Sequence, residues 1–180
     1  DPTVSGYLHF LDYGLTCAPD DSENPFVRPL LKQDGNYYVV SAAATELHDY
    51  DWIARHVPND GSVRLNNITS AYAVLTLAGP RPRALVPALP DPDVSQKAFG
   101  FFRCKEFRVG MVPVRAIRMS FVGELGFELH HRIEYQRHLY DLLMTEGEQH
   151  GIVDFGYRTL DSLRLEKAYR LWGSDMSADW

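Results

Sequence analysis

The stretch RMSFVGELGFELH, at residues 118–130, places two glycines between two apolar runs. It predicts a strand that ends at Phe121, a compact turn at GELG (residues 123–126) and a second strand over residues 127–130. If the turn reverses the chain after Phe121, Glu128 lies on the returning strand and its side chain can face inward. The stretch therefore predicts an antiparallel strand pair that carries an acidic side chain.

Two interpretations of Glu128 follow from this local pattern. A carboxylate at the base of an aromatic-lined pocket can accept two parallel N–H bonds from an amidine-like heterocycle such as a pterin. Alternatively, Glu128 forms a salt bridge with a nearby arginine, for which Arg118 and Arg132 are the candidates. The stretch alone leaves both interpretations open.

The chain before this stretch predicts several short strands and a helix. An Asp-Gly pair at residues 34–35 predicts a hairpin between strands at residues 26–31 and 37–41. Residues 45–57 carry apolar side chains at helical spacing, and the sequence PNDG ends that pattern. Further strands are predicted at residues 6–11, 62–66 and 72–78, and a short helix is predicted to end near Leu85.

The second half of the chain predicts strands followed by two helices. Strands over residues 101–109 and 112–121 flank a Gly-Met turn, and an amphipathic helix over residues 134–150 ends before Gly151. A last helix is predicted over residues 157–169. Because strands and helices alternate irregularly and hairpin turns replace βαβ units, the sequence predicts an α+β fold with antiparallel sheets and packed helices.

A proline-rich connection at residues 87–92 is the predicted boundary between two sub-regions, residues 1–86 and residues 87–180. The chain begins with Asp1-Pro2 rather than with an initiator methionine. We therefore expect it to be a piece of a longer protein or a processed product.

The composition is that of a packed globular protein, with 45% apolar residues among 180 and a net charge of −6. No basic stripe is present that would favour nucleic acid or an anionic membrane surface as a partner. No apolar run approaches the ~20 residues of a membrane span. We predict a soluble, cytoplasmic protein, with the mitochondrial matrix as the alternative. Cys17 and Cys104 are then expected to be buried thiols, with a disulfide as the alternative.

Several catalytic and cofactor motifs are missing from the sequence. There is no GxGxxG or GxxxxGK[ST] loop, which excludes a Rossmann-type dinucleotide site. There is no HExxH motif, and His130 and His131 are adjacent on a predicted strand, so their side chains point to opposite faces. We therefore predict no metal site. The sequence also lacks a GxSxG motif, the pattern that would indicate a serine nucleophile.

Two long stretches resemble one known family. The GELGFEL run at residues 123–129 resembles a signature of the aminomethyltransferase (glycine-cleavage T-protein) superfamily. The run GYRTLDSLRLEKAYRLWG at residues 156–173 resembles its second signature, in the form typical of the folate-binding region of sarcosine and dimethylglycine dehydrogenases. Shorter matches are LAGPR at residues 77–81 and DWI at residues 51–53. The resemblance covers nearly the whole chain.

The resemblance implies a three-lobed fold whose central channel binds tetrahydrofolate. Members of the superfamily transfer a one-carbon unit from an N-methyl amine donor to the cofactor. By matching motifs, Glu128 is the expected pterin-binding carboxylate, and Tyr169 is an expected aromatic contact of the folate. Phe121 falls where many relatives have tyrosine, so it keeps a stacking face and lacks the hydroxyl.

The anionic tail of folate requires a cation, and Arg164, Arg170 and Arg118 are the candidates that the sequence offers. Arg164 has a second possible role as a helix-surface partner of Asp161, three residues earlier. The sequence does not choose between these roles.

The chain also departs from the family pattern. The family's catalytic aspartate position holds Gly14, with Asp12 two residues away, so no catalytic residue is assigned. Leu160 replaces an arginine of T-proteins. FAD is expected only in an upstream flavin-binding domain or subunit, which is the predicted partner. The first strands and the third lobe of the family fold are expected outside this chain.

Three functions are compatible with the resemblance. The leading one is the folate-binding, one-carbon-transfer region of a sarcosine or dimethylglycine dehydrogenase-like enzyme. The alternatives are a non-catalytic regulatory or binding module of the same fold, and a folate-dependent demethylase with another methyl donor.

Overall fold

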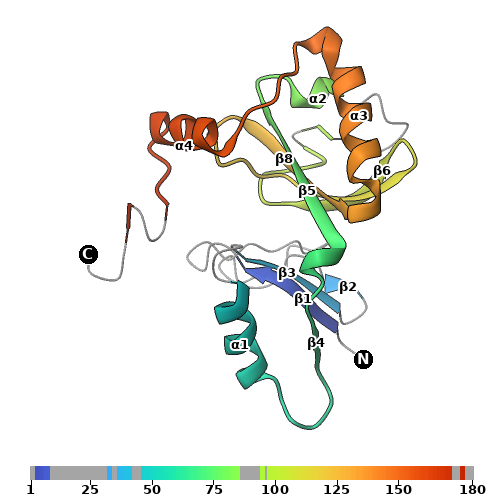
Figure 1. Cartoon of the computed structure of the whole chain (residues 1–180), viewed down its shortest axis with the longest axis vertical. Coiled ribbons are helices and arrows are strands. Elements are labelled where there is room, and N and C mark those ends of the chain that lie inside the picture. The colour runs from blue at the N-terminus through green and yellow to red at the C-terminus, as the bar shows by residue number, and fades with distance from the viewer. Residues whose placement is uncertain are drawn as a thin grey trace.

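The computed structural model describes residues 3–8, 32–33, 36–41, 46–85, 94–95, 97–171 and 175–176. These residues form two four-stranded sheets, each with its own helices (Figure 1). We call the part with the first sheet the first lobe and the part with the second sheet the second lobe.

The first sheet has the strand order β2-β3-β1-β4. β2 (Lys32–Gln33) and β3 (Asn36–Ser41) are antiparallel, which confirms a hairpin turn at the Asp-Gly pair, whereas the strand predicted at residues 26–31 lies outside the described residues. β1 (Thr3–Leu8), however, is parallel to both β3 and β4 (Arg64–Asn66). The expectation of purely antiparallel sheets is therefore wrong for this lobe. β3 and β4 thus run in the same direction, and helix α1 (Glu46–His56) forms the crossover connection that joins them.

Helix α1 (Glu46–His56) confirms the helix predicted over residues 45–57. None of its described side chains is buried, and Leu47 and Trp52 are 75% and 56% exposed. Acidic residues in the first turn and basic residues in the last turn complement the helix dipole. Helix α1 is thus stabilised along its own length more than by packing on a core.

The second sheet is antiparallel throughout, as predicted, with the order β5-β8-β7-β6. Its strands are β5 (Tyr72–Gly79), β6 (Cys104–Val109), β7 (Val112–Ile117) and β8 (Leu125–Arg132). β8 starts earlier than the sequence predicted, because Leu125 and Gly126 of the GELG turn already pair with β5.

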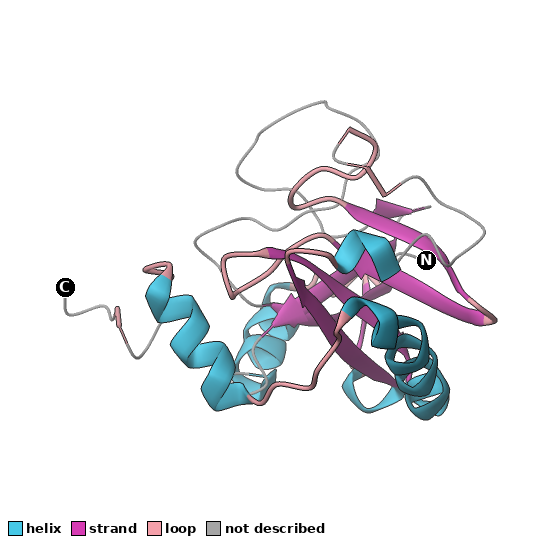
Figure 2. Ribbon diagram, turned by 90° about the horizontal axis from the view of Figure 1, so that it is seen from above, coloured by secondary structure: helices cyan, strands magenta, loops and turns pink. Residues whose placement is uncertain are grey.

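Three α-helices accompany the second sheet: α2 (Pro82–Leu85), α3 (Gln136–Gly147) and α4 (Tyr157–Glu166). Short 3-10 turns at Thr69–Ala71, Ile133–Tyr135 and Glu148–His150 connect the elements. Gly151 follows the last of these with φ 74°, as expected for a helix-ending glycine. Seen from above, the helix nearest the C-terminus, α4, projects to one side of the strands (Figure 2).

The main hydrophobic core lies between the second sheet and α3. Phe127 and Leu129 of β8 are 1% and 2% exposed and pack in one cluster with Leu139 and Leu143 of α3. This cluster continues through Val94, Phe99, Val109, Val112, Val114 and Ala116. One face of the second sheet is therefore covered by this core. The side chains of β8 that alternate with Phe127 and Leu129 point to the opposite face of the sheet.

The proposed boundary at residues 87–92 falls outside the described residues and stays a prediction. In the sheets themselves, the change from one lobe to the other occurs between β4 and β5, since β5 pairs with β8. No helix among the described residues is long and apolar enough to cross a bilayer.

Candidate functional site

Glu128 lies on the face of the second sheet that points away from α3. Its neighbour Phe127 belongs to the core, and side chains alternate along a strand. Glu128 has Thr76 and Ile117 as its cross-strand partners, so all three side chains share one face. Ile117 packs against Val40 of β3, in the first sheet. The face that carries Glu128 is thus turned toward the first lobe.

The side chain of Glu128 is 25% exposed and contacts a histidine rather than an arginine. His130 Nε2 lies 3.3 Å from Glu128 Oε2. Arg118 instead donates to a backbone carbonyl at 2.9 Å, and Arg132 pairs with Glu134 at 3.0 Å. Within the described chain, the alternative interpretation of Glu128 as the partner of Arg118 or Arg132 is therefore wrong.

His130 in turn connects Glu128 to the first lobe. Its Nδ1 atom lies 3.1 Å from the hydroxyl of Tyr38, a residue of β3. Both side chains are buried, at 2% and 7% exposure. The guanidinium of Arg115 lies 4.1 Å from the centroid of the Tyr38 ring. The sequence did not indicate this arrangement. The opposite orientation predicted for His130 and His131 is confirmed, because His131 bonds to Gln136, the first residue of α3.

The two family-like stretches contact each other at the glycine turn. Gly123 has φ 71°, and a Cβ atom there would lie 2.3 Å from Cγ of Lys167. Lys167 also pairs with Glu124 at 3.1 Å. At Gly126 a Cβ atom would lie 2.4 Å from Cβ of Ser120. Both glycines are therefore required by close approach of other chain segments.

Phe121 and Tyr169 are brought together by this contact. Their ring centroids are 6.4 Å apart and the rings are tilted by 53°. Tyr169 is 40% exposed. Gly126, beside which Ser120 packs, is two residues from Glu128 on the same face of β8. Ser120, next to Phe121 in the chain, therefore packs on the same strand as Glu128, two residues away from it.

Arg164 holds the end of α4 rather than facing solvent. It is 3% exposed, and it donates to Asp161 at 2.7 Å, to the carbonyl of Tyr169 at 2.8 Å and to Asp175. Burial opposes its charge, but the bonds to the two carboxylates outweigh this and raise the pKa of Arg164. The pKa of Asp175 is lowered, first by the backbone N–H of Leu171 and also by Arg164.

These contacts decide between the two roles of Arg164, because its guanidinium binds Asp161 as one alternative predicted. Arg118 is also buried and bonded to backbone. Arg170 is exposed. Among the three arginines considered for an anionic tail, Arg170 is thus the one that stands at the surface.

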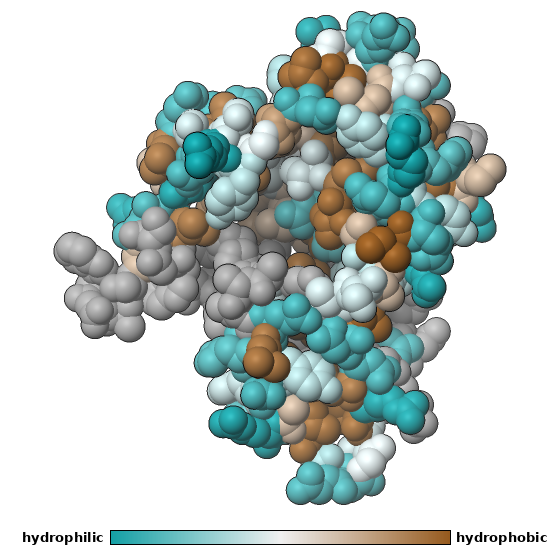
Figure 3. Space-filling model, viewed as in Figure 1, coloured by the Kyte–Doolittle hydropathy of each residue, from teal (hydrophilic) through white to brown (hydrophobic). Residues whose placement is uncertain are grey.

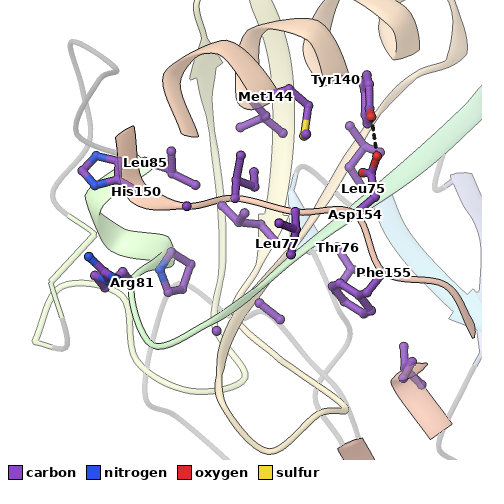
Figure 4. Close-up of a pocket in the computed structure, with 18 of the residues that line it drawn as sticks. Leu75, Thr76, Leu77, Arg81, Leu85, Tyr140, Met144, His150, Asp154 and Phe155 are labelled. Carbon is purple, nitrogen blue, oxygen red and sulfur yellow. Dashed lines mark hydrogen bonds between the residues drawn. The ribbon is translucent and has the colours of Figure 1, made fainter. Parts of the chain in front are cut away.

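A cleft of about 590 Å³ opens beside β5, between α3 and α4 (Figure 3). Arg81 and His150 lie at one end, and at the other end the hydroxyl of Tyr140 donates to Asp154 at 2.7 Å (Figure 4). Most of the remaining lining is apolar. Glu128, Phe121 and Tyr169 do not line this cleft. Glu128 therefore points to a surface that faces the first lobe, and the cleft reaches only its cross-strand partner Thr76.

Two further predictions concern cysteine and metals. Cys104 is a free thiol that is half-buried rather than fully buried. Desolvation raises its pKa to about 12, so the thiol is neutral at physiological pH. Cys17, Gly14 and Asp12 lie outside the described residues. Among the residues that the structure does describe, no group of three His, Cys, Asp or Glu side chains is arranged to hold a metal ion.

Comparison with known proteins identifies the same superfamily as the two family-like stretches at residues 123–129 and 156–173. The GCVT N-terminal domain family matches residues 30–180. Mitochondrial dimethylglycine dehydrogenase of Mus musculus is 43% identical over 146 residues, which are 81% of this chain and 17% of that protein. Mitochondrial sarcosine dehydrogenase of Homo sapiens is 35% identical over 163 residues, 90% of this chain and 18% of that protein.

A shorter relative is the aminomethyltransferase of Bacillus licheniformis, which is 34% identical over 167 residues, 93% of this chain and 45% of that protein. The chain thus spans less than half of each of these three relatives. The match to the family extends over more than four fifths of the chain. The chain therefore belongs to the GCVT N-terminal domain family of the aminomethyltransferase superfamily, on the side of the sarcosine and dimethylglycine dehydrogenases.

Proposed function

We propose that this chain is the tetrahydrofolate-binding, one-carbon-transfer region of a sarcosine or dimethylglycine dehydrogenase-like enzyme. Its family binds tetrahydrofolate, and its dehydrogenase relatives support an N-methyl amine as the donor of the one-carbon unit. A flavin-binding domain or subunit, which carries FAD, would oxidise that donor. The lobes described here would form two parts of a three-lobed ring.

The observation that carries the proposal is the environment of Glu128. Its carboxylate is half-buried, faces the first lobe and has one oxygen held by His130. Such a carboxylate can accept two parallel N–H bonds from the ring nitrogen and the exocyclic amine of a pterin. A carboxylate locked onto an arginine would not fit this role, and Arg118 and Arg132 are bonded elsewhere.

The aromatic pair and an arginine complete the fit. Phe121 and Tyr169 form a tilted ring pair beside the glycine turn that leads into the strand of Glu128, and a flat heterocycle can stack on or against such rings. Arg164 fixes the backbone of Tyr169 and so holds this pair in place. Arg170, exposed one residue beyond Tyr169, is our candidate for binding the anionic tail.

Tetrahydrofolate supplies the nucleophilic nitrogen to which the one-carbon unit is transferred. The residues of this chain orient the pterin and exclude water from it, which is the main requirement for a transfer between two bound groups. No catalytic acid or base is assigned. The position that resemblance gives to the catalytic aspartate, Gly14, lies outside both the described residues and the family match.

The dehydrogenase relatives bear on the location of the protein, because both are named as mitochondrial. They support the mitochondrial alternative and give no support to the cytoplasmic prediction. We therefore propose a mitochondrial location.

Titration of tetrahydrofolate into the full-length protein tests the proposal. Glu128→Gln replaces one acceptor oxygen by a donor, and losing a charge-assisted bond costs ~1.5–3 kcal/mol, or roughly ten- to over a hundredfold in affinity. Glu134→Gln is the matched control, because its exposed pair with Arg132 contributes little and lies outside the proposed site. The proposal is wrong if the wild-type protein does not bind, or if both variants bind as well as wild type.

Turnover separates the leading function from the alternatives. With the flavin-binding part present, an enzyme of this kind forms methylenetetrahydrofolate from N-methylglycine or dimethylglycine. Folate binding without turnover on either amine would favour a regulatory module, and turnover only with other methylated compounds would favour a different demethylase.

A further inference from the structure

We infer that His130 is a positioning residue for Glu128, and that Tyr38 of the first lobe holds His130 in the required orientation. This inference rests on the proposed function, because Glu128 is taken to bind the pterin edge. It adds a connection between the two lobes that the two family-like stretches do not contain, since Tyr38 lies 92 residues before His130.

The three side chains form a continuous row of polar contacts. Glu128 Oε2 lies 3.3 Å from His130 Nε2, and His130 Nδ1 lies 3.1 Å from the Tyr38 hydroxyl. A neutral imidazole with its proton on Nε2 donates to the carboxylate and accepts at Nδ1 from the tyrosine. Each contact then has one donor and one acceptor, and the ring orientation is fixed from both sides.

Burial makes this row rigid. His130 is 2% exposed and Tyr38 is 7% exposed, so neither polar group has a ready alternative partner in solvent. The Tyr38 ring packs edge-on to the imidazole, with centroids 5.7 Å apart. Arg115, the cross-strand partner of His130, covers the Tyr38 ring and is itself held by Glu106 at 2.7 Å.

The consequence for the ligand is geometric. One carboxylate oxygen of Glu128 is engaged by His130, which restricts rotation of the carboxylate about its last bond. A bidentate contact with a planar N–H pair depends on the plane of the carboxylate. The first lobe thus contributes to pterin recognition through Tyr38 without requiring that Tyr38 contact the ligand.

Adjacent histidines provide a matched control for this inference. His131 is as buried as His130, at 1% exposure, but lies on the opposite face and bonds to Gln136 at 2.8 Å. Replacing His131 disturbs the same strand without touching Glu128. A merely structural effect is therefore expected from both histidines, whereas a positioning effect is expected from His130 alone.

The test measures the affinity of the full-length protein for tetrahydrofolate and for an analogue that lacks the exocyclic amine. His130→Leu is expected to weaken tetrahydrofolate binding by about tenfold, the effect of one bond to a charged acceptor, and to reduce the preference over the analogue. His130→Gln, which retains an N–H donor, should recover most of both. Tyr38→Phe should have a smaller effect, and His131→Leu should leave the preference unchanged.

A double-mutant cycle separates this inference from the proposed function. In a Glu128→Gln background, His130→Leu should cause no further loss of affinity. If wild type binds and Glu128→Gln weakens binding, but His130→Leu, His130→Gln and Tyr38→Phe leave the preference unchanged, the positioning role alone is overturned. If His130→Leu does not fold, His130→Gln and Tyr38→Phe decide the question. Failure of wild type to bind overturns the proposed function together with this inference.

Discussion

The two lobes differ in how their helices are used. In the second lobe, α3 buries Leu139 completely and covers one whole face of an antiparallel sheet. In the first lobe, α1 has no buried side chain among those described and connects two strands of a mixed sheet. The comparison teaches that the second lobe is organised by a conventional core. Its opposite face, which carries Glu128, is thereby left for contact with the first lobe and for the binding that we propose.

The same contrast applies to residues within β8. Phe127 and Leu129 lie in the core, whereas Glu128 and His130 lie on the opposite face. The core residues fix the register of the strand, and the register determines where Glu128 and His130 point. The predictions below test this division, from the largest expected effect to the smallest.

The largest expected effect is a loss of stability from opening the core of the second lobe. Leu139→Ala removes a side chain that is 0% exposed, and such changes cost about 2–5 kcal/mol of unfolding free energy. Leu47→Ala in α1 removes a side chain that is 75% exposed and should change the value by less than about 0.5 kcal/mol. Urea unfolding measures both. Equal effects of the two substitutions would refute the contrast between the helices.

A smaller effect is expected at the glycine turn. Gly126→Ala places a Cβ atom 2.4 Å from Ser120 and 2.8 Å from the backbone oxygen of Met119, and overpacking of this kind costs about 1–3 kcal/mol. Gly100→Ala is the control, because its Cβ meets only Arg103 at an ordinary 3.6 Å. Thermal unfolding of both variants measures the difference. Equal melting temperatures of Gly126→Ala and Gly100→Ala would show that the packing of Ser120 against Gly126 does not prevent a larger side chain at position 126.

The smallest effect concerns the end of α4 at low pH. The pKa of Asp175 is lower in the folded chain than in the unfolded one, so its contribution to stability is present above the unfolded value of 3.8. That contribution is lost as the pH falls through the lower, folded value. Asp175→Asn should therefore be less stable than wild type at pH 7, and the difference should shrink as the pH falls below 3.8. Unfolding followed across this range gives the answer, and a constant difference at all pH values would contradict it.

Much of the second lobe follows from sequence pattern, because its elements are determined locally. The apolar run of β5, the periodicity of α3 and α4, and the glycine after His150 all indicate their structures directly. β8 was predicted too short, because glycines are usually read as turn residues. Gly126 is instead a strand residue. Glycine is needed at this position because Ser120 occupies the space that a side chain would fill.

The first lobe and the surroundings of Glu128 depend on contacts between distant residues. The parallel pairing of β1 requires strands that are separated by long connections. The bond between Tyr38 and His130 spans 92 residues, and nothing in either local sequence indicates it. Alternation along β8 does place His130 on the same face as Glu128, so their contact was accessible to sequence reasoning. Phe121 and Tyr169 were found through family resemblance, which also favoured the pterin interpretation of Glu128 that the local pattern had left open.

A crystal structure of the full-length protein with tetrahydrofolate tests the central claim most directly. We expect both oxygens of Glu128 within ~3 Å of the ring N–H and the exocyclic amine, with His130 still bonded to the carboxylate and the pterin beside Phe121 and Tyr169. A pterin bound in the cleft beside β5, or anywhere that leaves Glu128 without contact, would contradict the claim.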